Sequence, residues 1–167
     1  LYAFVCFRDR RAPLLACLTA AAGAVAILAG ALAWGGGFPG SIALLVQLAV
    51  LALATGGVFG AMILGHWYLV TPKLPEAPLV ALSRLLLGLV VAQIALFVGS
   101  MALGAGVGAG AFAPLFGPWA LFVWLRLLIG LVFPLVVSWA AIQTARTRSM
   151  ESATGLLYID VGAIAAG

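Results

Sequence analysis

Uninterrupted apolar runs longer than 20 residues fill most of this chain, and they restrict what it can fold into. One example is "PLLACLTAAAGAVAILAGALAW" at residues 13–34. A bilayer-spanning helix needs about 20 consecutive apolar residues. Within hydrocarbon every backbone polar group must be satisfied internally, so only helix bundles and closed barrels span a membrane. Barrel strands would alternate apolar and polar residues over about 10 positions. The runs do not alternate, and they therefore predict membrane-spanning helices.

The predicted fold class is an all-α polytopic transmembrane helix bundle, with four complete spans and a partial span at each end. The expected spans are residues 13–34, 41–69, 79–104, 119–145 and 152–167, and residues 1–7 have the composition of the end of a preceding helix. Ser41 is the expected N-cap of the second span. We treat residues 1–167 as a single transmembrane domain. Both ends fall within apolar runs, so we expect the native protein to be longer.

Composition agrees with a membrane protein. The chain is 66% hydrophobic and 7% charged, whereas soluble domains have about 25% charged residues. A net charge of +4 would favour nucleic acid as the partner of a soluble protein. In a membrane protein it marks cytoplasmic loops instead, so we expect no nucleic-acid partner. Cys6 and Cys17 form no CxxC motif and are expected to be free thiols.

Basic residues predict the orientation. Three segments hold seven of the eight: Arg8, Arg10, Arg11, Lys73, Arg84, Arg146 and Arg148. They alternate with two uncharged connections, "GGGFPG" and residues 104–118. The positive-inside rule then places the loops at 8–12, 70–79 and 146–151 in the cytoplasm. The expected location is the inner (cytoplasmic) membrane of a bacterial cell, with a multi-pass topology.

Small residues predict where the helices meet. Lipid-embedded helices associate by close packing through small side chains spaced four residues apart. Such pairs are Ala22/Ala26/Gly30, Gly56/Gly60, Gly88/Ala92 and Ala95/Gly99. The stretch "TGGVFGAMILG" is the densest, so the span at 41–69 is the candidate for the packed centre. The alternative is a groove that holds a flat ligand against bare backbone.

Polar residues within spans are costly, and each is a functional hypothesis. Arg126 lies seven residues after Trp119, at a depth of about 10 Å by helical rise. Pro134 cannot donate to the carbonyl of Gly130 and is expected to kink the helix there. Arg126 therefore suits an anionic headgroup, a carboxylate or a quinone oxygen. The alternative is a structural ion pair, or a side chain that extends to the interface.

Three other polar residues accompany Arg126. Asp160 is the obvious counter-ion, with an expected vertical gap of about 5 to 10 Å by helical rise. A buried acid of this kind can also act as a proton relay. Gln47 and Gln93 either line the same interior or form hydrogen bonds between helices.

His66 ends the second span beside Trp67 and Tyr68, ahead of a proline-rich segment. The segment is first of all a hairpin connection, with the aromatic pair as interface anchors. A histidine can also bind haem iron or the magnesium of a chlorophyll. A bis-histidine haem needs two histidines, and His66 is the single histidine of this chain.

The sequence lacks the short motifs that are typical of common enzyme classes. No HExxH, GxSxG, P-loop or paired carboxylates occur, so we name no catalytic residue and no metal site, and a non-enzyme is favoured. The first hypothesis is a non-catalytic membrane subunit of a larger assembly, such as a respiratory or photosynthetic electron-transfer complex. Its partners would be membrane lipids and other membrane subunits, and its ligand a lipid or quinone. The alternatives are a transporter component using Arg126 and Asp160, and a haem or chlorophyll protein using His66.

Overall fold

The computed structural model describes residues 12–71, 75–102, 116–117, 120–147 and 149–165. Every regular element within them is helical, so the predicted all-α fold is confirmed. The elements are α2 (Ala12–Trp34), α3 (Phe38–Val70), α4 (Ala77–Ala102), α5 (Ala120–Leu125), the π-helical η1 (Arg126–Val132), α6 (Phe133–Arg146) and α7 (Met150–Ala165). α5, η1 and α6 follow one another without a break and form one long helix.

Four helices are long and apolar enough to cross a membrane, so the chain is an integral multi-pass membrane protein. They are Pro13–Trp34, Phe38–Val70, Ala77–Ala102 and Ala120–Arg146. These spans agree with the predicted ranges to within three residues at each end. α7 has 16 residues, a length of about 24 Å by helical rise. The segment at 1–7, expected to end a preceding helix, lies outside the described residues.

The turn between α2 and α3 explains one error in the predicted boundaries. The prediction that Ser41 caps this helix is wrong, because α3 begins at Phe38 with Gly37 at the cap position. Pro39 lies in the first turn, where its missing N–H costs no hydrogen bond. Gly36 and Gly37 have φ values of 66° and 138°, which L side chains rarely adopt.

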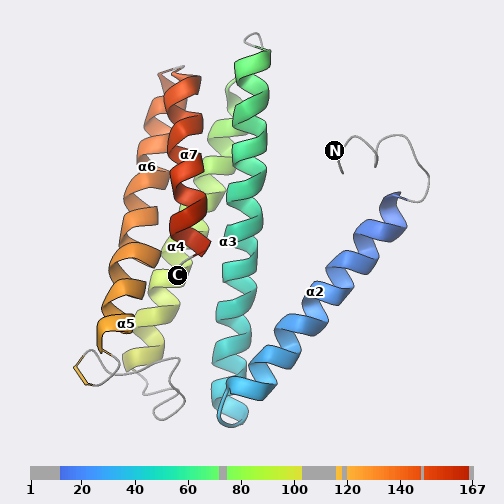
Figure 1. Ribbon diagram of the computed structural model, residues 1–167, viewed down its shortest axis with the longest axis vertical. Helices are drawn as coiled ribbons and strands as arrows, with labels where there is room; N and C mark the ends of the chain where they lie inside the picture. Colours follow the sequence, from blue (N-terminus) through green and yellow to red (C-terminus); the bar gives the residue numbers. More distant parts are fainter. Residues whose placement is uncertain (1–11, 72–74, 103–115, 118–119, 148, 166–167) are drawn as a thin grey trace.

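α3, α4, α6 and α7 form a four-helix ring (Figure 1). α3 packs against α4 and α7, and α6 packs against the same two helices. The core consists of inward-facing apolar side chains from all four: Ala54, Val58, Ala61, Leu79, Leu86, Val90, Ala141, Ala145, Leu157 and Ile164. Among the described elements, α3 also packs against α2.

Among the predicted small-residue pairs, a Cβ built on Gly30 would lie 3.7 Å from Leu48 Cδ1, and one on Gly60 would lie 3.8 Å from Leu82 Cδ2. A closer approach is at Gly65, which belongs to none of those pairs. A Cβ built on Gly65 would lie 2.7 Å from Thr154 Oγ1, so α3 and α7 approach closely there. By contrast, a Cβ on Gly56, Gly88 or Gly99 would meet nothing within 4 Å. The pairs Gly88/Ala92 and Ala95/Gly99 therefore do not mark close approaches within the described chain.

α2 lies outside the ring. It packs against α3 alone among the described elements, and Figure 1 shows it diverging from α3 towards its own N-terminal end. Between Pro13 and Trp34, Ala31 is the one buried residue. Its large apolar side chains are exposed on the outside of the molecule: Leu14, Leu18, Val25, Leu28 and Leu32.

The helix that carries Arg126 changes its hydrogen-bond pattern near Pro134. Proline has no N–H, so the carbonyl of Gly130 loses its α-helical donor. The N–H of Phe133 bonds to the carbonyl of Leu128, five residues back, and Arg126–Val132 is π-helical. Where the sequence predicted a kink, the helix contains a π segment, a feature that is frequent at functional sites.

Candidate functional site

Arg126 is the first residue of η1 and lies six residues after the start of α5 at Ala120, about 9 Å along the helix. Its side chain is half-buried. One terminal nitrogen, Nη2, donates a hydrogen bond to Oε1 of Gln47 at 3.2 Å. The guanidinium carbon lies 5.6 Å from the centre of the Phe97 ring, within the range of a cation–π contact.

Gln47 is held in place by α4. Its Nε2 donates to Ser100 Oγ at 3.0 Å and to the carbonyl of Leu96 at 3.4 Å. The Ser100 hydroxyl in turn donates to the same Leu96 carbonyl at 2.6 Å. An amide has one acceptor oxygen and one donor nitrogen, so these bonds turn the oxygen of Gln47 towards Arg126. The network joins α3, α4 and η1.

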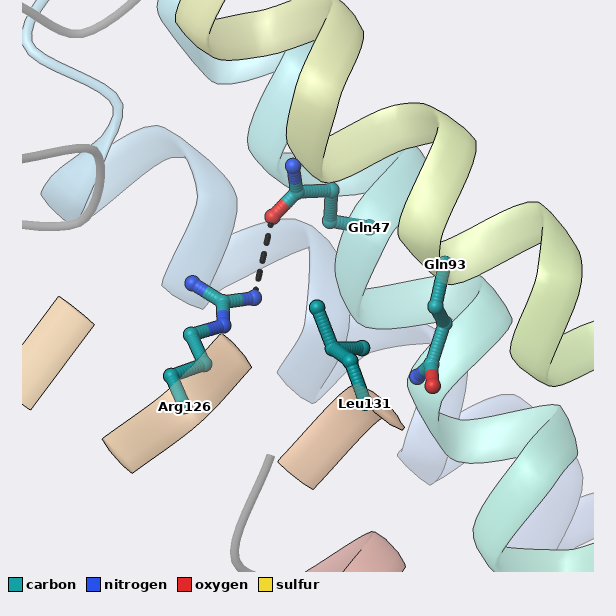
Figure 2. A pocket seen from close by; sticks show the side chains of 4 residues that line it. All are labelled: Gln47, Gln93, Arg126 and Leu131. Carbon is teal, nitrogen blue, oxygen red and sulfur yellow. Dashed lines mark hydrogen bonds between the residues drawn. The ribbon is translucent and has the colours of Figure 1, made fainter. Parts of the chain in front are cut away.

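A small pocket lies beside this network (Figure 2). Gln47, Gln93, Arg126 and Leu131 line it. Its free space is close to the size of one water molecule. The amide of Gln93 makes no hydrogen bond to any described residue. An oxygen atom placed in the pocket would have the guanidinium of Arg126 and the amide of Gln93 among its neighbours.

The structure brings together three of the four predicted polar residues, Arg126, Gln47 and Gln93, but not Asp160. Asp160 lies on α7, and its Oδ2 accepts a hydrogen bond from the Ser138 hydroxyl at 2.6 Å. Ser138 follows Arg126 by twelve residues on the same long helix, about 18 Å by helical rise. Arg126 and Asp160 thus bond to different partners at different depths.

Sequence reasoning missed two contacts. Phe97 lies between Gln93 and Ser100 at helical spacing, so its place on the same face of α4 was readable from the sequence. Ser138 lies on α6, and no local signal links it to Asp160, 22 residues later.

His66 is exposed near the end of α3, and none of the described residues forms a group of three or more His, Cys, Asp or Glu side chains that could hold a metal ion. Trp67 is also exposed, as an interface anchor should be. Tyr68 is buried instead, and its hydroxyl donates to the carbonyl of Pro75. Tyr68 is therefore part of the connection between α3 and α4.

Comparisons with protein-family models, curated proteins and solved structures find no match to this chain.

Proposed function

We propose that this chain is a non-catalytic membrane subunit that binds the anionic headgroup of a phospholipid at Arg126. The observation that carries the proposal is the pocket between Arg126 and Gln93, with the guanidinium held beside it by Gln47 and Phe97. A charged side chain within a span costs about 3 kcal/mol or more. Such a residue, fixed in orientation at a pocket, is suited to an anionic oxygen.

The size of the pocket narrows the ligand class. It has room for about one oxygen atom, so a headgroup oxygen fits while the rest of the ligand stays outside the protein. A quinone carbonyl oxygen is of similar size but neutral, so the positive charge of Arg126 favours the anionic headgroup oxygen. Arg126 lies about 9 Å from the outer end of its helix by helical rise, a depth from which a long side chain reaches lipid headgroups.

Lipid retention tests this site. The full chain and its variants are placed in nanodiscs that contain zwitterionic and anionic phospholipids, and the retained lipid is measured by native mass spectrometry. Arg126→Gln should lower affinity for the anionic lipid by about tenfold, since a charge-assisted pair is lost. Arg84→Gln is the matched control, because it removes the same charge from an exposed position on α4.

Two further results would show whether the bound anion is a lipid headgroup or a soluble anion, and whether Arg126 itself binds it. Competition by inorganic phosphate would make the ligand a soluble anion rather than a lipid. Equal losses in Arg126→Gln and Arg84→Gln would mean that net charge alone holds the lipid, and the site proposal would fail.

Membership of a larger assembly is supported by α2. About half of its residues are Ala or Gly, the composition that lets membrane helices approach closely, yet within the described chain it packs against α3 alone. We assign its exposed small-residue face to a helix of a second membrane subunit.

Co-purification from the native membrane tests this contact. Gly23 and Gly88 both face open space, since a Cβ on either meets nothing within 4 Å. Gly23→Leu on α2 should release the partner subunit, whereas Gly88→Leu on α4 should not. If the chain purifies alone under gentle conditions, the proposal that it belongs to a larger assembly is wrong.

An absorption spectrum of the same preparation tests the electron-transfer version of the assembly. Haem or chlorophyll bands that disappear in His66→Ala would favour that version. A colourless complex would mean that the subunit binds lipid and carries neither haem nor chlorophyll.

A further inference from the structure

Asp160 is a fully buried carboxyl in the core of the four-helix ring. Its relative exposure is 0%, and that of Ser138 is also 0%. The Ser138 hydroxyl donates to Oδ2 at 2.6 Å. The other oxygen, Oδ1, is buried and has no hydrogen-bond partner among the described residues. Oδ2 therefore has a hydrogen-bond donor, whereas no described residue donates to Oδ1.

Asp160 lies on a face of α7 that is largely apolar, with Thr154 as a further buried polar residue of that helix. It shares the inward face of α7 with Ala153, Leu157 and Ile164, which belong to the main core cluster. Val58 and Ala61 of α3 and Ala141 of α6 belong to the same cluster.

The charged and titratable groups on the elements packed against α7 have other environments. On α3, His66 is exposed and Tyr68 bonds to Pro75. On α6, Arg146 is exposed, and on η1, Arg126 donates to Gln47. On α7 itself, Glu151 and Tyr158 are exposed. Among these elements, Ser138 is thus the residue that forms a hydrogen bond with Asp160.

This environment does not suit a charged carboxylate or a metal ion. An isolated carboxylate buried in apolar surroundings is strongly disfavoured and becomes neutral instead. Calcium takes 6–8 oxygen ligands, and magnesium demands an octahedral set. The described residues around Asp160 supply one hydroxyl. One proton on Oδ1 neutralises the group and so removes the much larger cost of burying a charge.

We propose that Asp160 is a proton-binding site in the core of the ring. The carboxylate takes a proton from hydronium and releases water. The proton then resides on Oδ1, while Oδ2 keeps the hydrogen bond from Ser138. This site is separate from the Arg126 pocket, and it gives the chain a proton-uptake role that lipid binding does not require.

Infrared spectroscopy of the full chain in nanodiscs at neutral pH tests the proposal. A protonated carboxyl has a C=O stretch that a carboxylate lacks, and the band shifts in deuterium oxide. We expect this band in the wild-type chain and in Glu151→Gln, and its loss in Asp160→Asn. Ser138→Ala should move the band to higher frequency, because it removes the hydrogen bond to the carbonyl oxygen.

The folded state of the Asp160→Asn variant is a second measurement. An amide has the shape of the protonated carboxyl and can accept the same hydrogen bond from Ser138, so the thermal midpoint should stay near the wild-type value. A protonated-carboxyl band that persists unchanged in Asp160→Asn, or no such band in the wild-type chain, would overturn the proposal. Loss of the Arg126 ligand would not affect it.

Discussion

At the residue scale, buried polar side chains in this apolar chain fall into two groups. Gln47, Ser138 and Thr154 are hydrogen-bonded, the last to the carbonyl of Met150 at 2.7 Å. Ser83 is fully buried on α4, and its hydroxyl has no hydrogen-bond partner in the part of the chain that the structure describes. A buried polar group without a partner destabilises the fold, because it has lost its hydrogen bonds to water and gained none in the protein. The two groups should therefore respond to mutation with opposite signs.

Ser83→Ala should raise the stability of the protein. The substitution removes an unsatisfied buried hydroxyl with little change in volume, and the expected gain is about 1 kcal/mol. Ser138→Ala is the matched comparison and should lower stability by a similar amount, because it leaves Asp160 without its donor. Thermal unfolding in detergent, followed by circular dichroism, measures both. A loss of stability in Ser83→Ala would show that its hydroxyl has a partner such as a buried water.

At the scale of elements, helices were predictable and their local geometry was not. Long apolar runs can satisfy their backbone in lipid only as helices, so the spans followed from the sequence. Pro134 indicated a missing hydrogen bond, but sequence alone does not say whether the helix bends or widens. The grouping of Arg126 with Gln47 and Gln93 depends on how three helices pack, and sequence spacing carries no information about that.

We expect the π segment to position Arg126, so Pro134→Ala should move this side chain. Alanine restores the donor for the Gly130 carbonyl, so the segment can return to α-helical bonding. Each residue of an α-helix turns by about 100°, so closing the π segment would rotate Arg126 away from Gln47. We expect Pro134→Ala to remain folded and to lose anionic lipid as Arg126→Gln does. Unchanged lipid retention would mean that the π segment is not needed for the site.

Gly65 should be required for the contact between α3 and α7. A Cβ at this position would lie 2.7 Å from Thr154 Oγ1 and 3.3 Å from Thr154 Cβ, so the whole Thr154 side chain would have to move. Gly65→Ala should destabilise the chain by about 1–3 kcal/mol, as overpacking does. Gly88→Ala is the control, since its Cβ meets nothing, and alanine favours helix by about 1 kcal/mol.

A second variant makes the Gly65 prediction specific. Adding Thr154→Ala removes the Oγ1 and Cγ2 atoms near the new Cβ, and should recover part of the lost thermal stability. If Gly65→Ala is as stable as Gly88→Ala, the helices can separate there without cost, and the close approach does not stabilise the bundle.

At the scale of the molecule, the two ends of the bundle differ in charge. The end of α3, the start of α4, the end of α6 and the start of α7 lie together at one end (Figure 1). This end carries Glu76, Arg146 and Glu151. The opposite end holds the turn at Gly35–Gly37 and the start of α5, without charge among the described residues there. Positive-inside asymmetry of this kind sets the orientation of membrane proteins.

Cysteine labelling measures that orientation directly. Cys6 and Cys17 are first replaced by alanine, and single cysteines are then introduced at Phe116, at the uncharged end, and at Ser149, beside the start of α7. Both positions are exposed. A membrane-impermeant maleimide should label the Phe116→Cys variant in intact cells, and the Ser149→Cys variant only after lysis. The reverse pattern would place the basic end outside, against the charge rule. Labelling of both positions in intact cells would contradict a membrane between the two ends of the bundle.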